Sequence, residues 1–266
     1  MPRSVAICFA NNKGGSGKST TCSSVAYALA VKGKRVLLID GDMQMNLTLS
    51  YFSEDRSLEI AKSGENLYTA VKDQKPLDDY ILSTDYEGID LLPSSTLMSG
   101  IEYELFSKWQ REFILKKLLK EVRDQGVYDY ILIDAPPTLG CWVMNVLIAS
   151  DFVVLPVEAS PWGLFGLANM FDFIKQVKEI SDTPEVLGVA ITKADSRKNY
   201  LKQTLETLKE GGIDVFDSVI HLDSSIEWAQ DNSMPVGSYK KSARAAKEYA
   251  ALTDEILKRV KARIKQ

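Results

Sequence analysis

The sequence predicts an α/β fold, a doubly wound and mostly parallel sheet with helices on both faces. Three observations predict it. Short runs rich in Val, Ile and Leu recur along the chain, these runs are almost continuously apolar, and segments with helical periodicity separate them. Continuous apolar runs are typical of strands that are buried on both faces of a parallel sheet. Strands that alternate with helices through right-handed crossovers build the doubly wound architecture.

The apolar runs predict strands over 5–10, 35–40, 89–94, 130–134, 151–157, 186–192 and 215–220. A first helix begins at Lys18, because Cys22, Val25 and Leu29 recur at helical spacing, and Gly33 ends it. Further helices are expected over 103–125, 163–180, 198–210 and 242–264, and the polar segment 53–66 is expected to be a loop. Because no linker or repeat interrupts the pattern, we expect one domain over residues 1–266.

Composition excludes several classes of protein. The chain has 266 residues, is 45% hydrophobic and carries a formal net charge of −4. It has no run of 18 apolar residues, and its first ten residues lack the layout of a signal peptide, so we expect a cytoplasmic protein. The three cysteines are far apart with no C-x-x-C spacing, which argues against a zinc or iron–sulfur site. Residues 240–266 are the basic exception, with nine Lys or Arg against three Asp or Glu.

The stretch "NKGGSGKS" at 12–19 resembles the phosphate loop G-x-x-x-x-G-K-[ST], with Asn12 at the first glycine position. Glycines let backbone N–H groups turn toward phosphate oxygens, and the following helix presents its N-terminus to the same anion. In such a loop Lys18 bridges the β- and γ-phosphates and the Ser19 hydroxyl binds Mg²⁺. The candidate nucleotide-binding residues are Lys13, Gly14, Gly15, Ser16, Gly17, Lys18, Ser19 and Thr20.

Three aspartates follow apolar strands. Asp40 and Asp42 end the second predicted strand, and Asp134 ends the run "YILID". Ligands of such sheets bind at the carboxyl ends of the strands, and Mg²⁺ prefers oxygen ligands and keeps several waters. We therefore expect Ser19, Asp42 and Asp134 to form the magnesium site, with Asp134 holding a metal-bound water.

These motifs resemble the ParA/MinD group of ATPases, whose deviant Walker A motif is K-G-G-x-G-K-[ST]. The segment "DGDMQMN" is similar to that group's D-x-D-P-Q-G-N, with Met43 and Met45 where the group has Pro and Gly. Similar stretches at 135–138, 149–170, 192–200 and 234–257 extend the resemblance over almost the whole chain. Because the phosphate loop starts near residue 12, the chain resembles the short, Soj-like ParA proteins without an N-terminal helix-turn-helix.

The resemblance implies an ATPase that partitions plasmids or chromosomes and uses ATP and Mg²⁺. Lys13 would reach across an ATP-dependent homodimer to the partner chain's nucleotide, and Asp42 would position the attacking water. Lys13, Lys18 and Asp42 are therefore the expected catalytic residues, and Asp40 would support the magnesium shell. The dimer would bind DNA nonspecifically on the nucleoid, and a ParB-like centromere-binding protein would stimulate an otherwise slow hydrolysis.

Relatives of this type carry two arginines where this chain has Leu222 and Ser225, so other cations would have to bind DNA. The candidates are Arg197, Lys198, Lys202, Lys240, Lys241, Arg244 and Lys247. Three alternatives stay open. First, the last helix has an apolar stripe, so it could simply pack on the sheet instead of binding DNA. Second, the chain could be a MinD-like ATPase that binds membranes. Third, "TKAD" at 192–195 partly matches the guanine-recognition motif N-K-x-D, so the nucleotide could be GTP. The tail lacks Trp and Phe, which disfavours the membrane hypothesis.

Overall fold

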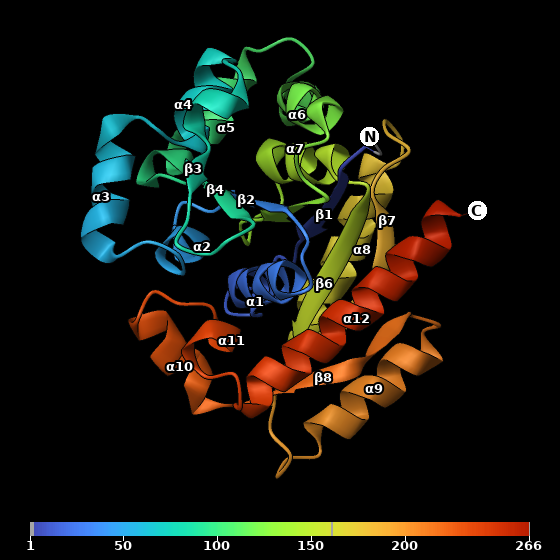
Figure 1. Cartoon of the computed structure of the whole chain (residues 1–266). Coiled ribbons are helices and arrows are strands. Elements are labelled where there is room, and N and C mark those ends of the chain that lie inside the picture. The colour runs from blue at the N-terminus through green and yellow to red at the C-terminus, as the bar shows by residue number, and fades with distance from the viewer. Residues whose placement is uncertain (1–2, 161, 266) are drawn as a thin grey trace.

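The computed structural model describes residues 3–160 and 162–265, and it is built on an eight-stranded sheet (Figure 1). The strands lie in the order β3-β4-β2-β5-β1-β6-β7-β8. All neighbouring pairs are parallel except β3 and β4. The strands are β1 (Val5–Phe9), β2 (Val36–Asp40), β3 (Leu82–Ser83), β4 (Ile89–Leu92), β5 (Tyr130–Asp134), β6 (Phe152–Glu158), β7 (Glu185–Ala194) and β8 (Val215–His221). The predicted fold class is therefore confirmed.

Side chains of the central strands pack on both faces of the sheet, which explains the continuous apolar runs. In β1, Cys8 belongs to the core on one face, while Ile7 and Phe9 belong to the core on the other. In β5, Ile131 and Leu132 divide between the two cores in the same way. Successive strand residues point to opposite faces, so both positions must be apolar when helices cover both faces.

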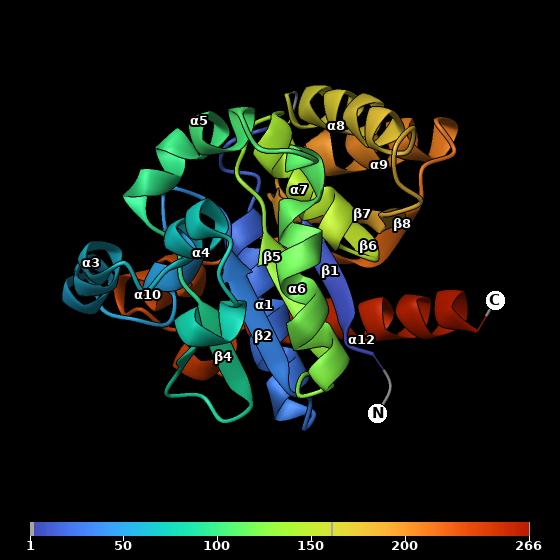
Figure 2. The same ribbon diagram turned by 90° about the horizontal axis from the view of Figure 1, so that it is seen from above.

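Helices cover the two faces unequally (Figure 2). One face holds α1 (Lys18–Val31) and α12 (Arg244–Ile264), with the short α2 (Asn46–Leu49) beside α1. Most other helices cover the opposite face or flank the sheet. These helices are α3 (Glu54–Ser63), α4 (Leu67–Asp73), α5 (Ile101–Phe106), α6 (Ile114–Gln125), α7 (Cys141–Ala149), α8 (Gly163–Val177) and α9 (Tyr200–Glu210). The pair α10 (Ser224–Asp231) and α11 (Val236–Tyr239) joins β8 to α12 near the end of α1.

Two predictions of secondary structure were wrong. The segment 53–66 is not a loop, because α3 occupies most of it. Ser53 is the N-cap of this helix, and Gly64 ends it in the left-handed conformation. The expected helix over 103–125 is broken in two. Helix α5 ends at Phe106, a 3₁₀ turn covers Arg111–Phe113, and α6 begins at Ile114. The break lies at Gln110, whose φ of 51° is incompatible with a continuous right-handed helix.

The final helix packs on the sheet as its apolar stripe indicates. Tyr249, Leu252 and Ile256 are buried against the same core as α1. Two of its basic residues have structural contacts: Arg259 donates to the backbone carbonyls of Leu187 and Val215, and Arg263 pairs with Glu185. Part of the basic charge of the C-terminal segment therefore holds the helix in place. Among the described residues, no helix has the length and hydropathy that a bilayer span requires.

Candidate nucleotide-binding site

The predicted phosphate loop connects β1 to α1 at the carboxyl edge of the sheet. Gly15 and Gly17 have φ values of 74° and 85°, a region that residues with a Cβ rarely adopt. Gly17 is also the N-cap of α1, and no side chain caps that terminus. The first N–H groups of α1 are thus left for an anion, as in other phosphate-binding helix termini.

A hollow of about 630 Å³ lies over this loop. Such a volume is typical of small-molecule sites. Its walls include the loop and the start of α1, Asp42 and Gln44 from the loop after β2, and Lys193 near the end of β7. The far wall comes from the segment 221–230, which contains the start of α10. Six of the eight predicted nucleotide-binding residues and one of the predicted acids therefore line one cavity, and Lys13 and Ser16 are the two that do not.

Lys18 and the predicted acids lie close enough to influence one another. Burial lowers the pKa of the Lys18 ammonium, and the charges of Asp134 and Asp42 oppose that shift. Burial also raises the pKa of Asp134 well above its usual range, and the Asp40 carboxylate adds to the increase. Both carboxylate oxygens of Asp134 are buried, and no described residue meets full hydrogen-bond geometry with them, although the Ser19 hydroxyl lies close enough to lower the Asp134 pKa. Such an unpartnered, buried acid fits a water in the shell of a magnesium ion.

Asp40 and Asp42 have different surroundings. The Asp40 carboxylate is fully buried and accepts hydrogen bonds from the Thr48 N–H at 2.8 Å and from the Thr48 hydroxyl at 2.6 Å. Asp42 lines the hollow, and within the described ranges its carboxylate accepts only the Gln44 N–H, at 3.1 Å. Asp40 therefore shapes the loop, and Asp42 is the acid that faces the cavity.

Lys13 lies at the other side of the phosphate loop. Its ammonium pairs with Glu158 at the end of β6, at 2.6 Å, and donates to the Ser160 hydroxyl at 3.1 Å. Lys13 is not among the residues that line the hollow over its own loop. A single chain therefore holds this ammonium on its own carboxylate, away from its own nucleotide site.

Comparison with known proteins identifies the family. A family model described as an AAA domain matches residues 4–186. The chain is 34% identical to the sporulation initiation inhibitor protein Soj of Bacillus subtilis, over 94% of this chain and 97% of Soj. It is 31% identical to the chromosome partitioning protein ParA of Caulobacter vibrioides, over 95% and 94% of the two chains. The chain belongs to the ParA/Soj family of partition ATPases.

Solved structures agree with this family. A plasmid partition protein of Borrelia burgdorferi bound to AMPPNP superposes with a TM-score of 0.80 at 27% identity, covering 96% of this chain and 99% of that one. Cobyrinic acid a,c-diamide synthase of Mycobacterium smegmatis, with ADP and magnesium, gives 0.81 at 27% identity over 97% and 96%. The fold thus also occurs in a biosynthetic enzyme, and the sequence relatives distinguish the partition family from it.

The loop after β2 carries methionine at two positions where the family motif has other residues. Met45 stands where the family motif has glycine, and its φ is 57°, in the left-handed region that glycine adopts readily. Its side chain is buried, and α2 starts directly after it. Met43 stands where the motif has proline and is exposed. Packing of Met45 therefore holds a conformation that glycine would adopt without strain.

The base side of the ParA/Soj pocket does not support guanine recognition by "TKAD". Both Asp195 oxygens accept hydrogen bonds from the Arg197 guanidinium at 2.9 Å, which lowers the Asp195 pKa to about 2. Asp195 does not line the hollow, and the Thr192 hydroxyl donates to the Ser16 carbonyl at 2.8 Å. Two of the three side chains that the motif specifies, Thr192 and Asp195, are therefore engaged elsewhere, and only Lys193 of the three lines the hollow.

The candidate DNA-binding cations divide into two groups. Arg197, Lys202 and Arg244 pair with carboxylates of their own chain, and Lys198 lies 4.0 Å from Asp195. Within the described part of the chain, the remaining three have no carboxylate within ion-pair distance, and they are Lys240, Lys241 and Lys247. All three lie between α11 and the first turn of α12. Among the described residues, this short basic segment is therefore the part of the predicted DNA surface whose charges are not balanced by ion pairs.

Sequence reasoning missed several residues of the site. Glu158 and Ser160 hold Lys13, Thr192 supports the phosphate loop, and Gln230 of α10 donates to the Thr20 hydroxyl at 3.0 Å. Glu158 and Thr192 follow the rule that ligands meet the carboxyl ends of strands, which could have found them. No sequence signal marks Gln230.

Gly166 of α8 packs directly on the phosphate loop, and we expect Gly166→Ala to weaken ATP binding about tenfold. A Cβ there would lie 2.8 Å from the Asn12 side-chain oxygen and 3.0 Å from the Lys13 Cβ, so the loop would have to shift. Titration with a fluorescent ATP analogue measures the loss. Gly100→Ala is the control, because its Cβ would meet nothing within 4 Å. Equal affinities of both variants would contradict this role of Gly166.

Proposed function

We propose that this chain is an ATP-dependent partition switch. ATP and Mg²⁺ join two chains face to face, the dimer binds DNA without sequence preference, and a ParB-like partner stimulates hydrolysis and releases it. The observation that carries the proposal is Lys13 in the deviant phosphate loop, placed outside its own hollow in a chain of the ParA/Soj family. Magnesium supplies charge neutralisation for the β- and γ-phosphates, and Ser19, Asp42 and Asp134 are the residues that would hold it.

The chain's own residues divide the work on ATP. Loop N–H groups and the start of α1 bind the phosphates, and Lys18 compensates their charge. Asp42 faces the hollow and orients the attacking water by accepting its proton in a hydrogen bond. A second cation, delivered by the partner chain's Lys13, stabilises charge on the transferring phosphoryl group. Hydrolysis thus requires the dimer, because one chain keeps its Lys13 on Glu158.

Lys13→Ala tests the dimer. We expect the variant to bind ATP with an affinity within about threefold of wild type, because Lys13 does not line its own hollow. ATP-dependent dimerisation, measured by light scattering with a non-hydrolysable analogue, should be lost. Lys32→Ala is the control, since Lys32 makes a half-exposed ion pair with Asp254 at the far end of α1. Normal dimerisation of Lys13→Ala would contradict a role in trans.

The DNA step is tested with random-sequence duplex DNA. We expect binding with ATP but not with ADP, and a slope of log affinity against log salt of about −0.9 for each phosphate neutralised. Combining Lys240→Glu with Lys241→Glu should weaken binding about tenfold or more and flatten the slope. Combining Lys202→Glu with Lys198→Glu should do less, because Lys202 and Lys198 lie near Glu206 and Asp195. Equal losses of DNA affinity in both double variants would assign DNA binding to a broader surface. ATP-dependent binding to anionic liposomes without any binding to DNA would favour the MinD-like alternative.

A further inference from the structure

Helix α5 and the turn after it expose three large aromatic side chains. Tyr103, Phe106 and Trp109 have exposed fractions of 91%, 77% and 88%. They are spaced three residues apart, while Ile101 and Leu105 of the same helix are buried in the core. An apolar face of this kind is rarely left in water unless it binds something, and aromatic rings dominate the energetics of protein interfaces.

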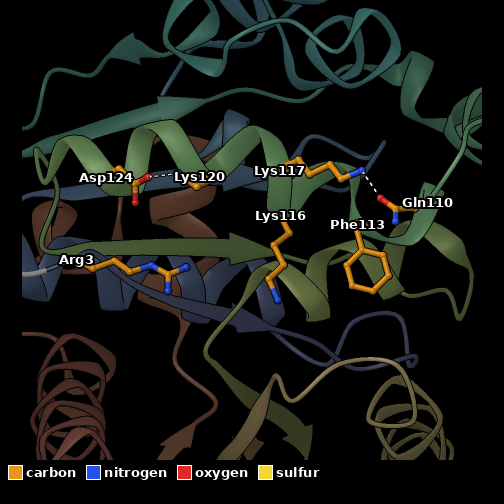
Figure 3. A pocket seen from close by; sticks show the side chains of 7 residues that line it. All are labelled: Arg3, Gln110, Phe113, Lys116, Lys117, Lys120 and Asp124. Atoms are coloured by element: carbon orange, nitrogen blue, oxygen red, sulfur yellow. Dashed lines mark hydrogen bonds and ion pairs between the residues drawn. The ribbon is translucent and has the colours of Figure 1, made fainter.

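A basic hollow begins where this aromatic face ends. It has a volume of about 530 Å³ and lies along α6 (Figure 3). Gln110 and Phe113 line it together with four cations and one carboxylate. These charged residues are Arg3, Lys116, Lys117, Lys120 and Asp124. Lys120 pairs with Asp124 at 2.5 Å and Lys117 donates to Gln110 at 2.7 Å. In the described part of the chain, Arg3 and Lys116 have no carboxylate within ion-pair distance, so the hollow keeps a positive charge.

Helix α5 is also connected to the loop that carries Asp42. The Glu102 carboxylate accepts the backbone N–H groups of Cys141 at 3.1 Å and Trp142 at 3.0 Å, at the start of α7. It occupies the space beside Gly140, where a Cβ would collide with it. The Trp142 indole then donates to the Gly41 carbonyl at 2.9 Å, between Asp40 and Asp42. Two successive contacts thus join the exposed helix to the site of hydrolysis.

We propose that the α5–α6 surface, formed by Tyr103, Phe106, Trp109 and the basic hollow, docks an acidic, amphipathic segment of a protein partner. Apolar side chains of that segment cover the three rings, and its carboxylates enter the hollow beside Arg3 and Lys116. Docking is transmitted through Glu102 and Trp142 to the Asp42 loop. The transmission rests on the proposed ATPase function, and the docking does not.

The chemistry of the surface selects this occupant. Duplex DNA contacts proteins mainly through its phosphates, so the protein surfaces that bind it are polar and cationic. Such a surface does not require three exposed aromatic rings. The Arg111 guanidinium lies 5.7 Å from the centre of the Phe106 ring, which reduces the area on which an unpaired base could stack. Carboxylates beside apolar side chains match both halves of the surface.

The docking test uses a labelled synthetic peptide of about 16 residues, with leucines at helical spacing followed by four glutamates. A twin has lysines in place of the glutamates. Without nucleotide, we expect fluorescence anisotropy to show the glutamate peptide binding about tenfold tighter than its twin. Combining Phe106→Ala with Trp109→Ala should weaken it about tenfold, and combining Lys116→Glu with Lys120→Glu should reverse the preference. Trp228→Ala, which removes an exposed ring on α10, is the matched control.

Several outcomes would overturn the docking proposal. These are equal binding of the two peptides, an equal loss in Trp228→Ala, and displacement of the peptide by an oligothymidylate or by duplex DNA. Loss of ATP-dependent dimerisation in the ring variants would instead assign this face to a second copy of the chain. Because these measurements need no hydrolysis, they stay informative even if the chain proves not to be an ATPase.

The transmission has its own readout. With wild type, saturating glutamate peptide should change the rate of ATP hydrolysis at least about twofold. Glu102→Ala, and separately Trp142→Phe, should bind the peptide with unchanged affinity but show no change in rate. Circular dichroism confirms that both variants are folded. A full response of both folded variants to the peptide would disprove the connection through Glu102 and Trp142.

Discussion

Lys18→Ala is expected to abolish measurable ATP binding, with a loss of affinity of roughly 100-fold or more. A hydrogen bond between charged groups contributes about 1.5–3 kcal/mol, and each 1.4 kcal/mol corresponds to about tenfold. Removal of this ammonium also leaves Asp134 and Asp42 without the cation whose charge acts on both of them. Their uncompensated charge would then repel the incoming phosphates, so the loss exceeds that of one contact.

Isothermal titration with ATP and Mg²⁺ measures this effect, and Lys32→Ala, directly after the same helix, is the control. Lys18 is buried, so circular dichroism must show that the variant is folded. ATP binding by folded Lys18→Ala at wild-type affinity would remove the phosphate-loop assignment, and with it the proposed function.

The layered fold was predictable because its signals are local and strong. Runs such as 131–133 are apolar at every position, and only a strand buried on both faces requires that. Helix α3 was missed because it buries only Ser57 and Ile60 and so has little apolar periodicity. Its capping signals were nevertheless present, with Ser53 before two acids and Gly64 after Lys62. Caps therefore identify exposed helices that periodicity cannot.

The phosphate loop was predictable because the spacing of its glycines and its position directly after a predicted strand are both local features of the sequence. The contacts that complete the site depend on residues far apart in the chain, such as Lys13 with Glu158 or Thr20 with Gln230. Only the order of strands brings β6 beside β1 and β7 beside β6, and that order is a tertiary property. The break between α5 and α6 could not be predicted from the sequence either, since Gln110 adopts a left-handed conformation that glutamine rarely adopts.

Asp42→Ala is expected to separate ATP binding from hydrolysis. General acid–base groups contribute about 10²–10⁴-fold to rate, so turnover should fall by roughly that factor. ATP affinity should stay within about threefold of wild type, because Lys18 and the loop N–H groups bind the phosphates and Ser19 and Asp134 remain to hold Mg²⁺. The loop itself should persist, because the Asp40 carboxylate and Thr48 hold it independently of Asp42.

Asp42→Asn distinguishes the charge of this residue from its shape. The amide oxygen preserves an acceptor for the Gln44 N–H, so loop geometry is retained while the group that accepts the water's proton is lost. If Asp42 orients the water, both variants should dimerise with ATP and stay dimeric, because nothing then converts ATP to ADP. Phosphate release from pre-formed dimers measures this in a single turnover. Release at the wild-type rate from Asp42→Asn would assign the water to another residue, and Asp134, the other acid beside Lys18, would be the next to examine.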